Sequence, residues 1–242
     1  MSEPADAPLR DPSAETRSAA PRQARAVATR GAILDAAAEE FSAASYHEAS
    51  LSRILERSRV TKGALYFHFV SKESIALAVV DEMEQLCREL VVRARDRGLD
   101  PLRTAAEVAR EVQDALAGPV LRAGQRLCSE GFAGPHRPGW PFTYWQQVFG
   151  EQFALAADAG LLRPEVDAAA FSRTVVDVSA GSFVTSLGIS GLADLAQRVC
   201  ENWELLLAAT ADPGWLEGWR ASGGMRAVLG PHLATGGWVA QA

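Results

Sequence analysis

The sequence predicts an all-α protein, with a three-helix helix-turn-helix module near the N-terminus and a larger helical bundle behind it. From Gln23 onward, apolar residues recur at helical spacing, and capping residues, glycines and prolines separate the resulting segments. No segment shows the convincing apolar–polar alternation of a β-strand, and no internal repeat is visible. The 242 residues suffice for one large or two modest domains.

The composition is that of a globular protein in water, with 48% hydrophobic and 22% charged residues. No run approaches the ~18 apolar residues that a membrane helix needs. The acidic, Pro- and Ser-containing N-terminus does not have the pattern of a signal peptide. We therefore expect a cytoplasmic protein with no membrane partner.

Charge is distributed unevenly along the chain, whose net charge is −6. Residues 22–72 carry eight Arg and Lys against five Asp and Glu, a net charge of +3. Residues 73–242 carry 14 Arg and Lys against 21 Asp and Glu, a net charge of −7. A basic module on an acidic body suits a protein that meets phosphates with one face only.

The pattern of reactive residues favours neither a metal site nor an enzyme. Cys87, Cys128 and Cys200 are far apart and lack CxxC spacing, so we interpret them as small buried hydrophobic residues. The four histidines show no HExxH pairing, and the chain has no GxSxG elbow or Gly-rich phosphate loop. We expect no cofactor, metal or catalytic residue. An all-α enzyme acting on small apolar substrates is the alternative from another class.

The first predicted elements are a tail and a helix. Residues 1–21 are rich in Pro, Ser and Ala and have no apolar period, which indicates a disordered tail. From Gln23 a helix is expected, with Val27, Leu34 and Phe41 on its apolar face.

Two short helices are predicted next. Ser50 is a suitable N-cap for the first, and Thr61 for the second, which runs to His68. Three helices within about 45 residues, with a tight turn before the third, predict a helix-turn-helix domain over residues 22–70. The expected core residues near its end are Leu65, Phe67 and Phe69.

The body of the chain, residues 71–212, is predicted to contain the longer helices. Their expected N-caps are Ser71, Asp100 and Asp167. Residues 131–141 have the composition of an internal loop. Residues 213–242 are rich in Gly and Trp and are expected to form an irregular extension.

The third helix has exposed residues that suit contact with DNA in the major groove. Lys62 is a cation at its start, and Gly63 and Ala64 allow the backbone to approach a duplex closely. Tyr66 and His68 carry polar tips that can donate to phosphate oxygens. The alternative is that the two rings are packed aromatics and that Lys62 is only a solvated charge.

Residues 60–73, Val-Thr-Lys-Gly-Ala-Leu-Tyr-Phe-His-Phe-Val-Ser-Lys-Glu, resemble the signature of the TetR family of repressors. The run over residues 62–69 is similar to the γ-butyrolactone receptor branch, which regulates antibiotic production and differentiation in actinobacteria. The similarity is strong over residues 25–80 and looser through residues 120–127 and 141–145.

This resemblance implies a non-enzymatic transcriptional repressor that binds double-stranded operator DNA as a homodimer. It further implies a small hydrophobic effector, such as a γ-butyrolactone, that releases the repressor and so controls secondary metabolism. Lys62 would read a base, and Lys72 would contact a phosphate. The predicted DNA-binding residues are Ser50, Thr61, Lys62, Gly63, Ala64, Tyr66, His68 and Lys72.

Two residues depart from the family pattern. Arg59 stands in the turn where the family usually has a glycine with positive φ, and a non-Gly residue there costs ~1 kcal/mol. Ser45 likewise stands where the family prefers glycine. A helical interaction protein that has lost DNA binding is therefore a third hypothesis, with Arg59 as its reason.

The body is expected to hold an effector pocket, which needs aromatic walls and one or two polar anchors. Trp145 is the strongest candidate, because its indole ring is large and its N–H can donate. It also matches the tryptophan that lines the lactone pocket in the receptor branch. The other predicted ligand-binding residues are Leu127, Val148, Phe149, Phe153 and Ser179. Ordinary core packing is the alternative for each of them.

The resemblance to TetR-type four-helix bundles also implies a self-complementary dimer face on the last two long helices. The predicted interface residues are Val175, Val176, Leu195, Val199, Trp203 and Leu206. The alternative is that these apolar stripes belong to the core of a single chain.

Overall fold

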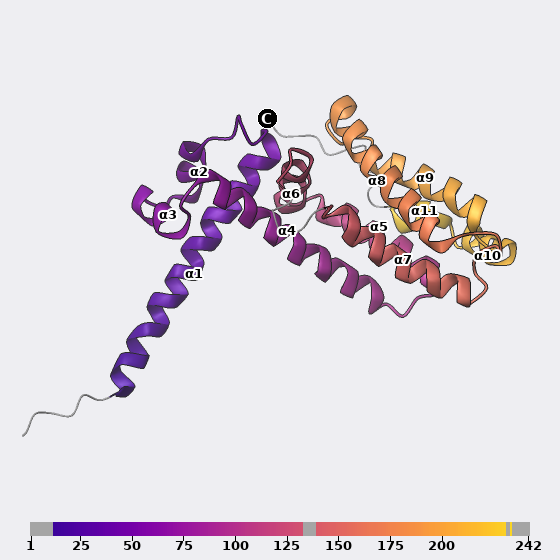
Figure 1. The fold of residues 1–242 in the computed structure, drawn as a ribbon, viewed down its shortest axis with the longest axis horizontal. Helices are drawn as coiled ribbons and strands as arrows, with labels where there is room; N and C mark the ends of the chain where they lie inside the picture. Colours follow the sequence, from indigo (N-terminus) through magenta and orange to yellow (C-terminus); the bar gives the residue numbers. More distant parts are fainter. Residues whose placement is uncertain (1–11, 133–138, 231–232, 234–242) are drawn as a thin grey trace, which may run out of the picture.

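The computed structural model describes residues 12–132, 139–230 and 233, and it contains eleven α-helices and no β-strand within those residues (Figure 1). The predicted all-α class is confirmed. Leu162 and Ala211 form an isolated antiparallel bridge. The helices in the described residues are α1 (Pro12–Ala43), α2 (Leu51–Ser58), α3 (Lys62–His68), α4 (Lys72–Arg95), α5 (Pro101–Ala115), α6 (Pro119–Ser129), α7 (Phe142–Asp158), α8 (Ala168–Ser190), α9 (Leu195–Thr210), α10 (Pro213–Ala221) and α11 (Gly224–Val228).

The helices form a small module at one end and a larger bundle at the other (Figure 1). In the small module α2 and α3 pack beside the C-terminal half of α1. The long helix α4 leaves this module and runs along the bundle, where α5, α7, α8 and α9 lie. Because α4 contacts α1, α5 and α6, it joins the two parts of the molecule.

Local hydrogen bonds confirm the expected helix starts. The Ser50 hydroxyl accepts a hydrogen bond from the backbone N–H of Ser52, and the Thr61 hydroxyl accepts one from Ala64. Ser71 and Ser74 form a reciprocal capping box at the start of α4. The carboxylates of Asp100 and Asp167 cap α5 and α8.

Two terminal expectations differ from the structure. Helix α1 begins at Pro12, so residues 12–21 are helical and not part of a disordered tail; residues 1–11 lie outside the described residues. This stretch has no apolar stripe, but three of its ten residues are Ala, which favours helices. Residues 213–229 are not irregular, because α10 and α11 occupy most of them; residues 231–232 and 234–242 are outside the description.

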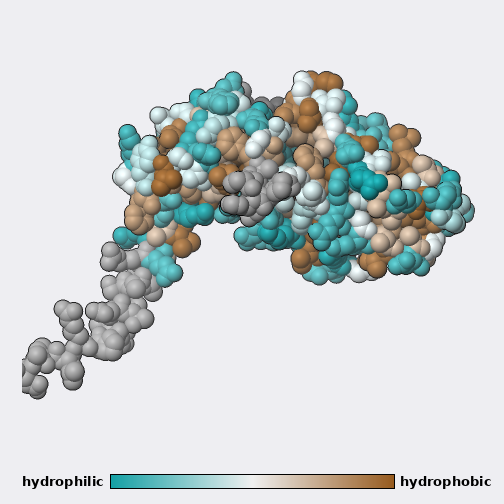
Figure 2. Space-filling view, viewed as in Figure 1, coloured by the Kyte–Doolittle hydropathy of each residue, from teal (hydrophilic) through white to brown (hydrophobic). Residues whose placement is uncertain are grey.

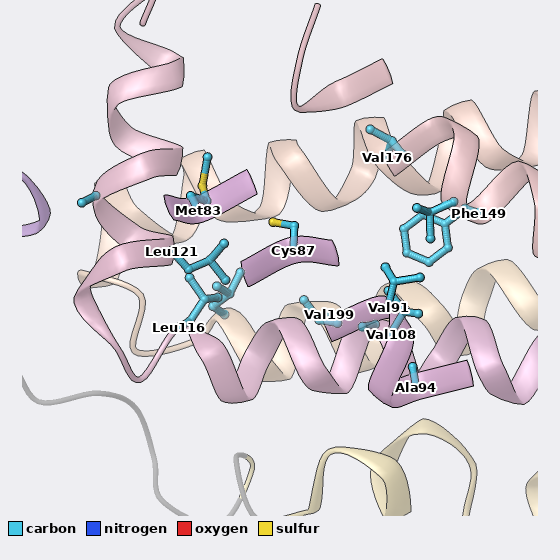
Figure 3. Close-up of a cluster of buried hydrophobic side chains, with 14 of the residues drawn as sticks. Met83, Cys87, Val91, Ala94, Val108, Leu116, Leu121, Phe149, Val176 and Val199 are labelled. Atoms are coloured by element: carbon cyan, nitrogen blue, oxygen red, sulfur yellow. The ribbon is translucent and has the colours of Figure 1, made fainter. Parts of the chain in front are cut away.

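The core of the bundle includes one side of α4. Figure 3 shows Met83, Cys87 and Val91 of this helix among apolar side chains from α5 to α9. At Gly124 a Cβ atom would collide with the Met83 side chain, so the glycine lets α6 cross α4 closely. A shift of α4 would therefore require repacking of the bundle core.

No single helix in the described residues is long and apolar enough to cross a membrane. Only α3 and α4 taken together satisfy the criteria of length and composition, and they are bent by 62° at the break between them.

Candidate DNA-reading helix and effector cavity

Helix α3 buries one face against the module and exposes the other. Leu65 and Phe69 are buried, as predicted, and they lie four residues apart on the same face. Phe67 is 81% exposed, so the prediction that it belongs to the core is wrong. Leu65 and Phe69 are four residues apart and share one face of the helix, whereas Phe67 lies two positions from each and points to the opposite side. This spacing in the sequence was sufficient to predict that Phe67 is exposed.

The exposed side of α3 brings together most of the predicted DNA-binding residues. Lys62, Gly63 and Tyr66 are exposed, and Ala64 and His68 are partly exposed. The Phe67 ring meets the His68 ring edge-on, with 5.1 Å between their centroids. Phe67 is thus an apolar member of the surface that sequence reasoning missed.

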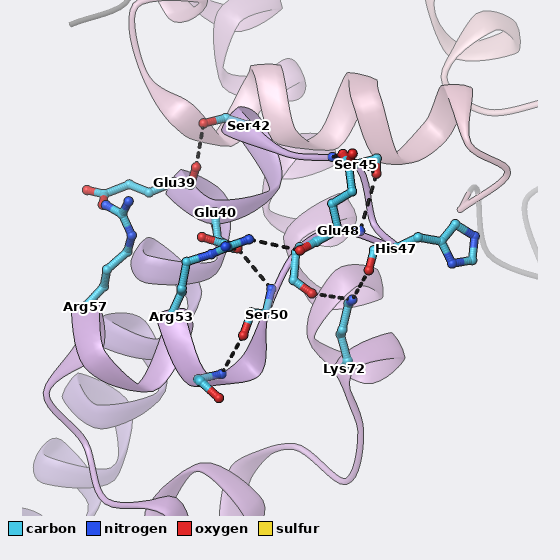
Figure 4. A network of polar contacts seen from close by, with 12 residues as sticks. Glu39, Glu40, Ser42, Ser45, His47, Glu48, Ser50, Arg53, Arg57 and Lys72 are labelled. Carbon is cyan, nitrogen blue, oxygen red and sulfur yellow. Dashed lines mark hydrogen bonds and ion pairs between the residues drawn. The ribbon is translucent and has the colours of Figure 1, made fainter. Parts of the chain in front are cut away.

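Two predicted DNA-binding residues also hold helix ends in place. The Thr61 hydroxyl accepts a hydrogen bond from the Ala64 N–H at 3.2 Å, which fixes the start of α3. The Ser50 hydroxyl accepts one from the Ser52 N–H at 3.2 Å, and the Ser50 N–H donates to Glu40 Oε1 at 2.9 Å. Since Glu40 is also bound by Arg53 Nε at 2.6 Å, this buried carboxylate ties α1 to α2 (Figure 4).

Of the two departures from the family pattern, Arg59 lies in the turn before α3 and Ser45 in the loop before α2. Arg59 has φ 54° and ψ 25°, and its N–H donates to the Leu55 carbonyl at 3.1 Å. The expected left-handed conformation at this position is therefore present, with an arginine in it. Ser45 does not have a positive φ, and its hydroxyl donates to Glu48 Oε2 at 2.7 Å, so this position does not need a glycine.

Lys72 is held by the loop between α1 and α2. Its Nζ donates to the carbonyls of Ala49 at 2.5 Å and His47 at 3.4 Å (Figure 4). The same ammonium lies 4.6 Å from the centroid of the Tyr46 ring. An ammonium has three N–H donors, so one remains for a phosphate after the two carbonyl bonds are made.

A cavity of about 150 Å³, lined in part by the exposed residues Phe142 and Val184, lies among α5, α6, α7, α8 and α9. Of the predicted ligand-binding residues, Trp145, Phe149 and Ser179 line it. The other three, Leu127, Val148 and Phe153, are buried but do not line it, which corrects their assignment. Phe153 lies behind Phe149, with its ring stacked between those of Phe149 and Phe171 at centroid distances of 6.0 and 4.2 Å.

The predicted dimer residues belong mainly to the interior of the chain. Val175, Val176, Leu195, Val199 and Trp203 are at most 7% exposed, and Leu206 is only half-buried. A second subunit has little access to buried side chains. The prediction that these residues form the dimer interface is therefore wrong for the five buried ones. Four of them line the cavity instead, namely Val176, Leu195, Val199 and Trp203.

Other residues of the same helices are exposed and apolar: Val184 and Ile189 on α8 and Leu205 on α9, between 60% and 71% exposed. Figure 2 shows hydrophobic residues at the surface over the C-terminal end of α8, among mostly polar neighbours. Helices α8 and α9 each carry apolar residues on two faces. The helical spacing in the sequence identifies both faces but does not show which one is buried.

Comparison with known proteins assigns the chain to a family. Residues 33–79 match the profile described as "Bacterial regulatory proteins, tetR family", and residues 100–211 match the "Tetracyclin repressor-like, C-terminal domain". The chain is also 37% identical over 196 residues to the A-factor receptor protein of Streptomyces griseus, covering 80% of this chain and 67% of that protein.

The chain belongs to the TetR family. Its fold is similar to a crystal structure described as a γ-butyrolactone receptor (ArpA-like protein), with a TM-score of 0.72 and 27% identity over 87% of this chain and 99% of the other. It is also similar to CprB from Streptomyces coelicolor in complex with its operator sequence, with a TM-score of 0.66 and 28% identity over 80% and 94% of the two chains.

The protein is therefore a TetR-type DNA-binding regulator related to γ-butyrolactone receptors, and TetR regulators are not enzymes. Helix α3 lies within the segment that matches the TetR N-terminal domain, and the cavity is built from the segment that matches the C-terminal domain.

Proposed function

We propose that this regulator is a homodimeric repressor that a small hydrophobic effector, such as a γ-butyrolactone or a related metabolite, releases from its operator. It would act in the cytoplasm, on genes of secondary metabolism. The observation that carries the proposal is an apolar cavity in the same molecule as an exposed DNA-reading helix, with α4 packed into both parts. The relatedness to proteins named as γ-butyrolactone receptors supports the class of effector.

In this proposal each subunit places α3 in a major groove, and the two half-sites lie about 34–36 Å apart or a multiple of that distance. Lys62 reads a base, while Lys72 uses its remaining N–H on a phosphate. The other proposed contacts are Ser50, Thr61, Gly63, Ala64, Tyr66 and His68. The exposed apolar residues Val184, Ile189 and Leu205 are candidates for the dimer face.

Release requires the effector to prefer the arrangement that does not bind DNA. A 100-fold preference at each site would contribute about 2.7 kcal/mol against operator binding. Helix α4 joins the helix-turn-helix module to the helical bundle. A tilt of this helix would therefore change the distance between the two α3 helices of the dimer, and the spacing of the major grooves in the duplex fixes the distance that operator binding requires.

Selection of bound fragments from genomic DNA, repeated with culture extracts added to supply the effector, tests this function. A sequence-specific repressor enriches defined operators and loses them when its effector is present. Lys62→Ala should cost about 1–3 kcal/mol of operator binding and relax discrimination at one base position, whereas Lys72→Ala should weaken all sequences alike. Failure to enrich any sequence, or equal loss on operator and random DNA for Lys62→Ala, would contradict the respective part of the proposal.

A further inference from the structure

Phe67 lies at the centre of the exposed face of α3. The buried residues Leu65 and Phe69 lie two positions to either side of it, and a helix turns by about 100° per residue, so the Phe67 side chain points away from the core. It is 81% exposed, and no other Phe, Tyr or Trp side chain of the described residues is more than 47% exposed. This ring adds nothing to the core and is available to a partner of α3.

Small residues lie beside the ring on the same face. Gly63 and Ala64 precede Phe67 by four and three residues, so they are its neighbours on the surface of the helix. A Cβ atom built on Gly63 would have no atom within 4 Å, which means that the surface beside the ring is open. Gly63, Ala64 and Phe67 thus form an apolar strip on α3. Polar side chains border this strip: Lys62 and Tyr66 on one side and His68 on the other.

The base edges in the major groove offer one kind of apolar group. Most of their groups are hydrogen-bond donors and acceptors, but thymine also carries a C5 methyl group. A phenylalanine ring cannot bond to a donor or an acceptor, and it would separate such a group from water without compensation. Against a thymine methyl group, the same ring removes apolar surface of both partners from water. The apolar strip therefore fits a thymine methyl group better than any other part of a base edge.

We propose that Phe67 is a specificity-determining residue that reads the C5 methyl group of a thymine in each half-site of the operator. Gly63 and Ala64 allow the backbone of α3 to approach the bases closely enough for the ring to reach this methyl group. This inference rests on the proposed function, because it concerns the operator that the same helix contacts.

Two other partners suit the ring less well. The candidate dimer residues Val184, Ile189 and Leu205 lie on α8 and α9 of the bundle, whereas α3 lies in the small module at the other end (Figure 1). The sugar–phosphate backbone is charged and hydrated, so cations and hydroxyl groups suit it better than a phenyl ring does. The strip lies between polar side chains that can contact phosphates, which leaves the strip itself for the bases.

Replacement of thymine by deoxyuridine in the selected operator tests this contact, because the two bases differ only in the methyl group. Each thymine of the half-sites is replaced in turn, and binding of the full chain is measured by fluorescence anisotropy at one fixed salt concentration. We expect binding to weaken about 4-fold for one lost methyl contact and about 15-fold for the same loss in both half-sites. An operator in which no thymine methyl group affects the affinity would overturn the proposal.

Substitutions assign the methyl contact to Phe67. In Phe67→Ala, the operator with deoxyuridine at the sensitive position should bind as tightly as the operator with thymine, and Phe67→Leu should retain part of the difference. Val70→Ala is the matched control, because Val70 is 84% exposed and lies just after α3 but outside the strip, so the difference should remain about 4-fold. A full difference in Phe67→Ala would mean that another residue reads the methyl group.

The replaced side chains are exposed, so the variants should fold, and urea unfolding checks this expectation. If Phe67→Ala binds both operators weakly, a lower salt concentration raises both affinities and keeps their ratio measurable.

Cytosine and 5-methylcytosine give an independent test at the same position. A C·G pair in place of the T·A pair presents different donors and acceptors, and methylation of its cytosine restores the methyl group alone. Methylation should strengthen binding of the wild type and should leave Phe67→Ala unaffected. A methyl group that strengthens binding of both proteins equally would contradict the assignment to Phe67.

The same measurements separate this inference from the proposed function. If the wild type selects no operator, the proposed function is wrong and the inference is wrong with it. If the wild type binds an operator equally well with thymine and with deoxyuridine, the inference alone is wrong.

Discussion

The backbone N–H of Tyr46 donates to Glu130 Oε2 at 2.7 Å, which joins the loop before α2 to the C-terminal end of α6. The Tyr46 ring also packs on the Phe132 ring, with 4.2 Å between the centroids. Phe132 is fixed in turn, because its N–H donates to the Leu127 carbonyl at 2.9 Å around Gly131, whose φ is +95°. The end of α6 therefore contacts the helix-turn-helix module through one hydrogen bond and one pair of rings.

Removal of this contact should weaken the effect of the effector on the operator. Helix α6 supplies Gln125 and Cys128 to the cavity wall, so Glu130 and the cavity share one helix. In Glu130→Ala, the difference in operator affinity with and without a γ-lactone such as γ-decalactone should be smaller than in the wild type, because the hydrogen bond from Tyr46 to the end of α6 is lost while the contact between the Tyr46 and Phe132 rings remains. The free energy of unfolding should fall by about 1 kcal/mol or less, since the bond is exposed.

Operator titrations with and without the lactone, together with urea unfolding, measure both quantities. Glu130→Gln is the control, because its amide oxygen still accepts from the Tyr46 N–H. An Ala variant that responds to the lactone as the wild type does would exclude this contact from the coupling.

Arg59 offers a test of backbone strain in the turn between α2 and α3. Because its φ is 54°, Arg59→Gly should relieve a left-handed conformation and raise the free energy of unfolding by up to about 1 kcal/mol. Arg59→Asn, which tolerates this region better than arginine, should give a smaller gain. Urea unfolding measures both changes. A loss of stability in the glycine variant would mean that the arginine side chain stabilises the turn by more than the strain costs.

The helix-turn-helix could be predicted from the sequence because its signals are local. Thr61 caps α3, and Leu65 and Phe69 repeat at four residues, all within one segment. Phe67 was wrongly predicted to be a core residue because it is aromatic, although its position two residues from Leu65 and Phe69 indicates the exposed face. Val199 and Leu205 are both apolar on α9, yet one is buried and the other exposed. Which neighbours cover them depends on α7, α8 and α11, and the sequence of α9 alone does not contain that information.

Asp194 should contribute a pH-dependent part of the stability. Hydrogen bonds from Arg198 Nε at 2.6 Å and from the hydroxyls of Ser186 and Ser190 hold its pKa well below its usual range. A carboxyl with a depressed folded-state pKa stabilises the fold above its unfolded pKa of about 3.9, and this stabilisation is lost as the pH falls through the folded value.

The comparison of wild type with Asp194→Asn isolates this effect. The difference in their free energies of unfolding should be constant from neutral pH down to about pH 5 and should then decrease as the medium becomes more acidic. Urea unfolding at a series of pH values measures it, with Asp158→Asn, an exposed carboxylate on α7, as the control. A difference that stays constant in acid would show that Asp194 keeps an ordinary pKa.

Helices α10 and α11 follow the segment that matches the family's C-terminal domain, and they should stabilise the bundle. Trp219 of α10 is 2% exposed, and its ring stacks on that of Trp215, with 5.4 Å between the centroids. The Arg103 guanidinium of α5 lies 5.3 and 5.9 Å from the centroids of these two rings, and the Glu204 carboxylate of α9 accepts from the Met225 N–H at 2.6 Å. Helices α10 and α11 thus connect α5 to α9, and both of these helices contribute to the wall of the cavity.

Trp219→Ala should therefore lower the free energy of unfolding by about 3–5 kcal/mol, because it leaves a large cavity in this contact. Trp219→Phe keeps an aromatic ring beside Arg103 and should lose clearly less. Leu155→Ala, at a position on α7 that is 54% exposed, serves as a control for the loss of exposed apolar volume and should change the free energy of unfolding little. A Trp219→Ala protein as stable as the wild type would show that α10 only rests on the bundle and does not brace α5 against α9.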